Sequence, residues 1–189
     1  MFFDKQAETR PLDEQYEMDK ASYASQVQYL FENSGFYQEK LKAAGFSSVK
    51  DIGGLEDIAS IPFTEKDEIR ASQANHPPFG NHLAAEPTRL RRVFSTSGTT
   101  GVPCYLGLTP GDLEIYATNV ARGYTAAGFA EGQRLVVGFN AGPFVAGAVY
   151  YGFDKIGCTV IPVGTGNTER MVTAIQKLGA TGISCTPSY

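Results

Sequence analysis

The chain is organised around the segment Phe94-Ser95-Thr96-Ser97-Gly98-Thr99-Thr100-Gly101-Val102-Pro103. Five of its ten side chains carry hydroxyls and two positions are glycine. Strand-like residues flank it, with Arg89–Phe94 before and Cys104–Leu108 after. Glycines allow backbone N–H groups to converge on one point, and short hydroxyls add donors, so a strand–loop–strand of this composition suits an anion. Polar hairpin turns share the composition, which alone leaves both interpretations open.

The segment differs from the phosphate loop of P-loop nucleotidases, which needs two glycines five apart, then Lys and Ser or Thr at a helix start. Here Gly98 and Gly101 are three apart, no Lys follows, and the next residues are strand-like. A helix dipole would therefore not assist. An anion would be held by the N–H and O–H donors of the loop itself, each worth about 1.5–3 kcal/mol towards a charged acceptor.

Composition is that of an ordinary globular protein, with 189 residues, 42% hydrophobic, 19% charged and a net charge of −4. This charge gives no reason to expect nucleic acid as a partner. Cys104, Cys158 and Cys185 are far apart and predicted to be buried, reduced thiols. His76 and His82 lack the spacing of a metal site, and none is predicted. We predict no membrane partner, because no apolar run approaches the ~20 residues of a span.

The first part of the chain, residues 1–88, is predicted to be a helical N-terminal segment. Apolar residues at helical spacing indicate helices from about residue 12 to Asn33, over Phe36–Ala44 and over about two turns at Leu55–Ala59. Thr64 and Asp67 have the spacing of a capping box for a further helix to about Ser72.

Residues 89–189 form the second predicted part, in which apolar strands alternate with helices. Strands are expected over 134–139, 158–163 and 181–185, and helices begin at Thr109-Pro110, Pro143 and Asn167 or Thr168. This alternation predicts an α/β fold with a mostly parallel sheet covered on both faces. The sheet is expected to be incomplete at the C-terminus, because the chain ends shortly after the last strand.

Two short loops follow strands of this sheet, 140–144 and 164–167. Ligands of open α/β sheets bind beyond the carboxyl ends of the strands, where both loops are expected. Each loop also has the composition of an ordinary strand-to-helix turn, so neither is diagnostic by itself.

Together these features resemble the adenylate-forming acyl-CoA synthetases, and within them the phenylacetate–CoA ligase family. Ser97-Gly98-Thr99-Thr100-Gly101-Val102-Pro103 resembles the phosphate-loop signature of the superfamily. Four further segments support the resemblance in the same order: Ile61–Asp67, Gly157–Pro162, Gly166–Arg170 and Cys185-Thr186-Pro187-Ser188-Tyr189.

The resemblance implies an ATP-dependent ligase that joins a carboxylic acid to CoA through an acyl-adenylate, with Mg²⁺. ATP phosphates would be held by Ser95, Thr96, Ser97, Gly98, Thr99, Thr100 and Gly101. An aryl, phenylacetate-like acid would lie against Phe139, Asn140 and Phe144. Two departures bear on this assignment. The family tends to have a Tyr/Gly-rich stretch where this chain has 139–143, and many acyl-CoA synthetases have Lys at the position of Cys104.

Members of the family are more than twice as long as this chain, so it is expected to be an N-terminal fragment. The adenine-contacting segment, the Mg²⁺-binding acid and the adenylation Lys would lie outside it. No catalytic residue or metal ligand is assigned within the chain, and we expect it to be inactive alone. We expect a cytoplasmic protein and leave a homodimer open. The alternatives are a non-catalytic module that binds a nucleotide or a partner, and another adenylate-forming relative such as an acyl-protein synthetase.

Overall fold

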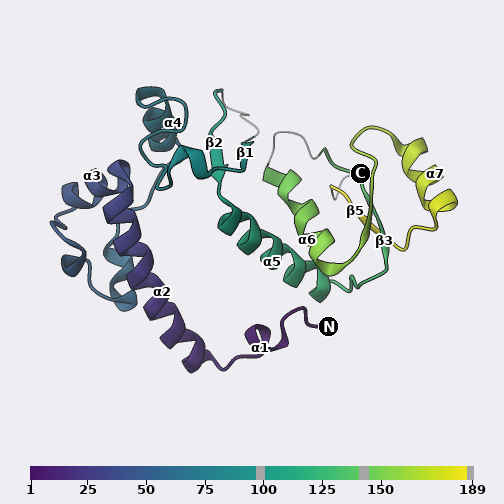
Figure 1. Cartoon of the computed structure of the whole chain (residues 1–189), viewed down its shortest axis with the longest axis horizontal. Coiled ribbons are helices and arrows are strands. Elements are labelled where there is room, and N and C mark those ends of the chain that lie inside the picture. The colour runs from purple at the N-terminus through teal and green to yellow at the C-terminus, as the bar shows by residue number, and fades with distance from the viewer. Residues whose placement is uncertain (97–100, 141–144, 187–189) are drawn as a thin grey trace. The chain divides into compact units, whose positions relative to one another are not determined.

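The computed structural model describes residues 1–96, 101–140 and 145–186, which Figure 1 draws in colour. Contacts divide the chain into two compact units. One, the helical unit, comprises Thr9–Arg92 and Ser97–Gly107. The other, the α/β unit, comprises Met1–Glu8, Val93–Thr96 and Leu108–Tyr189. The predicted domain boundary between residues 88 and 89 stays a prediction.

The helical unit contains the helices expected in the first part of the chain. They are α2 (Leu12–Asn33), α3 (Gly35–Ala43), α4 (Lys66–Asn75) and the 3₁₀ helix Leu55–Ser60. The unit also contains two 3₁₀ helices that were not predicted, Val49–Asp51 and Pro87–Arg89. Val27, Leu41 and Ile52 form their buried core. Ser34, which is also buried, separates α2 from α3 and accepts the backbone N–H of Tyr37 at 3.3 Å. This N-cap lets the chain end one helix and begin the next within a single residue.

The start of α4 differs from the prediction. Thr64 is not its N-cap, because the helix begins one residue later and Glu65 takes that position. The backbone N–H of Glu65 donates to the Glu68 carboxylate at 2.7 Å, and Lys40 approaches the same carboxylate at 2.5 Å. The predicted pair of Thr64 and Asp67 was therefore wrong by one position, because an acid three residues after Glu65 satisfies the helix start instead.

The α/β unit is built on a parallel three-stranded sheet in the order β4 (Thr159–Pro162), β3 (Arg134–Val137), β5 (Gly182–Ser184). Leu135 lies opposite Val160 on one side and Gly182 on the other. Its helices are the short α1 (Lys5–Glu8), α5 (Pro110–Ala126), α6 (Val149–Ile156) and α7 (Thr168–Leu178), and a 3₁₀ helix spans Val145–Ala148. These elements confirm the predicted α/β fold with its parallel sheet. Pro143, expected to begin a helix, lies outside the described residues.

Side chains along β3 alternate between two apolar layers. Leu135 and Val137 are fully buried in a cluster with Phe153 of α6 and Ala121 of α5. Val136 points the other way and packs with residues of α7. Helices α5 and α6 therefore cover one face of the sheet and α7 the other, as Figure 1 shows for α6 and α7 on either side of β3. Successive side chains of a strand point to opposite faces, so this continuous apolar run requires both layers.

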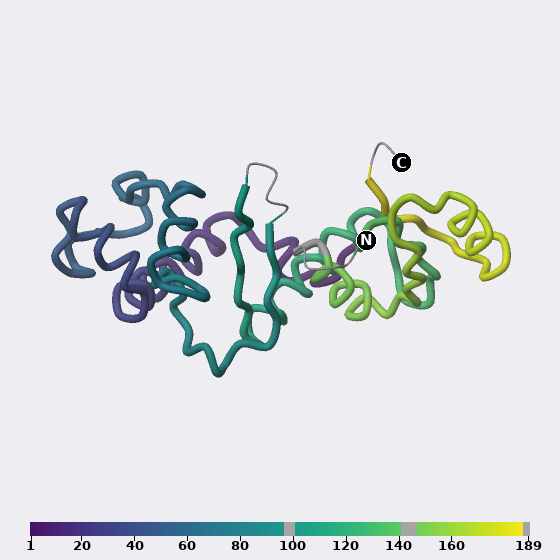
Figure 2. Tube along the Cα trace, turned by 90° about the horizontal axis from the view of Figure 1, so that it is seen from above, coloured from purple at the N-terminus to yellow at the C-terminus, as the bar shows by residue number. Residues whose placement is uncertain are grey.

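The hydroxyl-rich segment lies between β1 (Arg92–Ser95) and β2 (Tyr105–Leu108), which form a two-stranded sheet. Figure 2 shows these two strands leading into and out of it. The first strand begins later than predicted, because Pro87–Arg89 form a 3₁₀ helix. The strands expected on either side of the segment are otherwise present.

We predict that His82 makes the protein less stable in mildly acidic solution. Burial lowers the pKa of His82 from its ordinary value of 6.5, and its Nδ1 lies 2.9 Å from the Ser72 hydroxyl. Between the lowered pKa and 6.5 the unfolded chain binds a proton that the folded chain does not, so stability is lost as the pH falls through this window. Urea unfolding followed by circular dichroism from about pH 7.5 to about pH 5 should show this loss.

The variant His82→Asn should be less stable at neutral pH because it changes a packed site, but its unfolding midpoint should depend less on pH. His76→Asn is the matched control, since the His76 side chain is exposed. An equal pH dependence in wild type and His82→Asn would show that another group is responsible.

Candidate functional site

The described residues at the ends of the hydroxyl-rich segment differ in burial. Ser95 is the last residue of β1 and is buried, and Thr96 follows it partly buried. Both belong to the α/β unit, whereas Gly101 belongs to the helical unit and is exposed. Ser97, Gly98, Thr99 and Thr100, predicted to hold phosphate, lie outside the described residues.

Gly101 has a backbone conformation that other residues rarely adopt, with φ +132°. A Cβ built at this position would meet no atom within 4 Å. The glycine is thus required by the direction of the backbone and not by lack of space. Such a turn brings the chain out of the loop towards β2, and it aims backbone N–H groups in directions that an ordinary residue would not allow.

The predicted aryl-site residues follow β3 directly. The Phe139 ring packs partly buried against the core and lies 6.4 Å from the Tyr150 ring in an edge-on arrangement. Burial raises the pKa of Tyr150. Asn140 is exposed, and its side-chain oxygen accepts the backbone N–H of Thr165 at 3.4 Å. Phe144 lies outside the described residues.

This contact joins the loop after β3 to the loop after β4. The two strands are parallel neighbours, so their carboxyl ends meet at one edge of the sheet. Phe139, Asn140 and Thr165 therefore lie at the edge where ligands of open α/β sheets bind.

Gly138 is a close-packing position that the sequence analysis did not single out. Its N–H donates to the Ser184 carbonyl at 2.9 Å. A Cβ there would lie 2.6 Å from Met171 Cε and 3.1 Å from Cys185 Cβ. A larger residue would require the flexible end of Met171 to move and Cys185 to give way slightly, because α7 and the end of β5 approach the backbone directly before Phe139. A glycine inside an apolar strand is the sequence signal that could have indicated such an approach.

The cysteines form no disulfide with one another. Cys104 and Cys158 are buried as predicted, and burial raises the pKa of the Cys158 thiol. Cys185 is exposed, so the prediction of a third buried thiol was wrong; it follows the last residue of β5. Within residues 1–96, 101–140 and 145–186, no three His, Cys, Asp or Glu side chains gather as a metal site would need.

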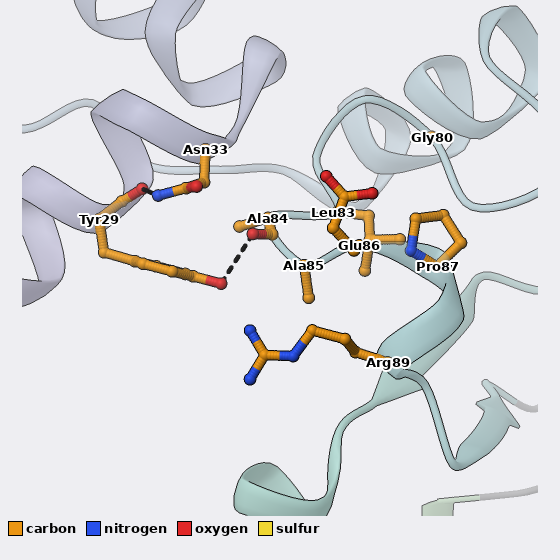
Figure 3. Close-up of a pocket in the computed structure, with 9 residues that line it drawn as sticks. All are labelled: Tyr29, Asn33, Gly80, Leu83, Ala84, Ala85, Glu86, Pro87 and Arg89. Atoms are coloured by element: carbon orange, nitrogen blue, oxygen red, sulfur yellow. Dashed lines mark hydrogen bonds between the residues drawn. The ribbon is translucent and has the colours of Figure 1, made fainter.

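A cavity of about 320 Å³ lies in the helical unit and contains none of the predicted site residues. Figure 3 shows the side chains of Tyr29 and Arg89 facing its open space, with the Tyr29 hydroxyl donating to the Ala84 carbonyl at 2.7 Å. The lining residues are Tyr29, Asn33, Gly80, Leu83, Ala84, Ala85, Glu86, Pro87 and Arg89. One guanidinium and one carboxylate give it no net positive charge, so it does not suit a triphosphate.

Comparisons with known proteins identify relatives along the whole chain. The chain is 39% identical over 191 residues to the phenylacetate-coenzyme A ligase of Thermus thermophilus, covering 100% of this chain and 41% of that protein. It is 36% identical over 164 residues to the enzyme of that name from Aromatoleum evansii, covering 86% of this chain and 36% of the relative. No protein-family model matches the chain.

A solved structure of 2-hydroxyisobutyryl-CoA ligase, in complex with 2-HIB-AMP and CoA, superimposes with a TM-score of 0.91 at 28% identity. The match covers 100% of this chain and 40% of that one. The chain thus spans about two fifths of the length of these relatives. Over the described residues, no helix is both long and apolar enough to cross a bilayer.

We predict that Gly101→Ala lowers the free energy of unfolding by about 1–3 kcal/mol, because alanine strains a positive φ. Gly111→Ala is the matched control. Its added Cβ also finds space, 3.8 Å from the nearest atom, but Gly111 lies in α5, where alanine is the better residue. Urea unfolding of both variants measures the difference. Equal stability of the two would show that the backbone at Gly101 does not require glycine.

Proposed function

Because phenylacetate-coenzyme A ligases match most or all of this chain, we propose that it belongs to their family of adenylate-forming enzymes and is the N-terminal part of an ATP-dependent acid–CoA ligase. The observation that carries the proposal is the hydroxyl-rich segment between β1 and β2, in a chain that matches such ligases from end to end. In the proposed reaction a carboxylate oxygen attacks the α-phosphorus of ATP and pyrophosphate leaves. The CoA thiolate then attacks the acyl-adenylate carbonyl and AMP leaves.

The part of this chain in the first step is to bind the β- and γ-phosphates of ATP. Ser95, Thr96 and Ser97–Gly101 supply hydroxyl and N–H donors without a lysine. Negative charge grows on the departing pyrophosphate, and donors already fixed around it stabilise the transition state. The positive φ of Gly101 supports this role, since it turns the backbone sharply at the end of the donor run.

Magnesium is part of the proposed reaction, and it would neutralise phosphate charge. In the described part of the chain no cluster of three acidic, His or Cys side chains could hold it. The donors proposed here are hydroxyl and N–H groups, whereas Mg²⁺ prefers carboxylate oxygens, phosphates and water. The described residues of this chain do not form a magnesium site, so we assign them no step through the metal.

For the acid, we propose an aryl carboxylate such as phenylacetate. Phe139 and Asn140 lie beyond the carboxyl end of β3, and Phe144 follows them in sequence. An aromatic wall favours an aryl ring through edge or offset contacts, worth about 0.5–1.5 kcal/mol beyond burial. The relatives named as phenylacetate-coenzyme A ligases support this choice. We place the complete protein in the cytoplasm, consistent with three cysteines that form no disulfide with one another.

We predict that Thr99→Ala and Thr100→Ala, made in the complete ligase, slow carboxylate-dependent ATP–pyrophosphate exchange about ten- to a hundredfold. Each change removes one hydrogen bond to a charged phosphate, worth about 1.5–3 kcal/mol. Thr118→Ala is the control, since the Thr118 hydroxyl donates within α5 to the Glu114 carbonyl, away from the hydroxyl-rich segment in sequence. If both loop variants kept the wild-type rate of ATP–pyrophosphate exchange, the segment would be a simple polar turn and not a phosphate site.

A second prediction concerns the acid. Phe139→Ala and Phe144→Ala should lower the preference for phenylacetate over a short aliphatic acid, measured as the ratio of kcat/KM values, by about tenfold or less each. The KM for ATP should change less than this ratio. A variant that instead raises the KM for ATP and keeps the acid preference would refute its place in the aryl site.

A further inference from the structure

We infer that Gln73 and Arg70 of α4 are positioning residues that hold the segment leaving the phosphate loop. The inference rests on the proposed function, because it assigns these side chains a role in ATP binding. Both side chains reach main-chain atoms 32 residues further along the chain. All the atoms involved belong to the helical unit.

Gln73 makes a paired contact with the first residue of β2. Its side-chain Nε2 donates to the Tyr105 carbonyl at 2.7 Å, and its Oε1 accepts the Tyr105 backbone N–H at 3.2 Å. One side-chain amide thus satisfies both polar groups of a single residue, as a neighbouring strand would. Such a pair fixes the position of Tyr105 along the helix, because a shift by one residue would break both bonds.

Arg70 holds the chain closer to the loop. Its Nε donates to the Val102 carbonyl at 3.2 Å, directly after Gly101. The same guanidinium contacts the Asp67 carboxylate at 2.5 Å. The Arg70 side chain is only 22% exposed although that of Asp67 is 87% exposed. The planar guanidinium is thus held in one orientation by partners that include Val102 and Asp67, an arrangement that a lysine would not reproduce.

These hydrogen bonds hold the residues that leave the loop against α4, where the apolar packing between the two is incomplete. A cavity of about 420 Å³ lies between them, lined by Asp67, Arg70, Ala71, Ala74 and Val102. The two alanines are too short to fill it, and Val102 remains 71% exposed. Arg70 and Gln73 thus add hydrogen bonds at Val102 and Tyr105, on either side of the buried Cys104.

Helix α4 is itself fixed within the helical unit. Lys40 of α3 approaches the Glu68 carboxylate at 2.5 Å, and the buried Ser72 hydroxyl donates to the Asn81 side chain at 2.8 Å. Gln73 and Arg70 therefore attach the loop exit to a helix that is itself held in place. Donors that stabilise a transition state must be held in place before the reaction, and a shift of about 1 Å can cost a hundredfold in rate.

The test compares Gln73→Ala, Gln73→Glu and Arg70→Met with wild type in the complete protein. Gln28→Ala is the matched control, since Gln28 is an exposed glutamine whose amide bonds only to Glu32 within α2. Hydrogen–deuterium exchange of residues 101–108 should become about thirtyfold faster in Gln73→Ala, which loses two hydrogen bonds of about 1 kcal/mol each. Gln73→Glu should be intermediate, because it keeps the acceptor but loses the donor.

The second readout is ATP binding by calorimetry. Gln73→Ala and Arg70→Met should raise the Kd for ATP about five- to tenfold and leave the Kd for the carboxylic acid unchanged, whereas a general loss of folding would weaken both. Unchanged amide exchange would refute the contact. Faster exchange with unchanged ATP binding would refute the positioning role. If the variants raise the Kd for ATP as expected but the protein makes no acyl-adenylate, the proposed function would be refuted and this inference upheld.

Discussion

Burial of β3 on both faces is the constraint on which the α/β unit depends. Leu135, Val136 and Val137 have no exposed surface, and each such side chain contributes about 1.5–3 kcal/mol when removed from water. Alternate side chains point in opposite directions, so helices are needed on both sides of the sheet. That requirement places α5 and α6 on one face and α7 on the other. It also leaves the carboxyl edge free for the loops that carry the proposed acid site.

Elements whose start and stop signals are local could be predicted from the sequence. Thr109 and Asp112 form a capping box at the predicted start of α5, and Gly157 ends α6 with a positive φ. In both cases the groups that satisfy the helix end lie within a few residues. The start of α4 lies one position after the predicted one, because two adjacent acids compete for the capping position there. Lys40, far away in sequence, pairs with Glu68, and no local pattern reveals this partner.

For the candidate site, too, only the features that are local in sequence could be predicted. Its donor-rich loop is recognisable because its chemistry is contiguous in sequence. The contact of Gln73 with Tyr105 was not recognisable, since a glutamine on an exposed helix has many interpretations and its partner is a backbone that every residue shares. The exposure of Cys185 was missed for a related reason, because a strand's last residues do not reveal where the covering layer stops. The first part of the chain contains no predicted site residue, yet its α4 contacts the loop exit directly.

The close approach at Gly138 has a consequence for how specificity could change during evolution. Met171 and Cys185 lie close to this backbone, so a side chain before Phe139 would require both neighbours to shift. Changes in the preferred acid substrate would then come from replacements at the following two positions. Within the proposed site, the scaffold stays constant while the ring-bearing position can be exchanged. New substrates would thus be reached by single side-chain steps that leave the strand undisturbed.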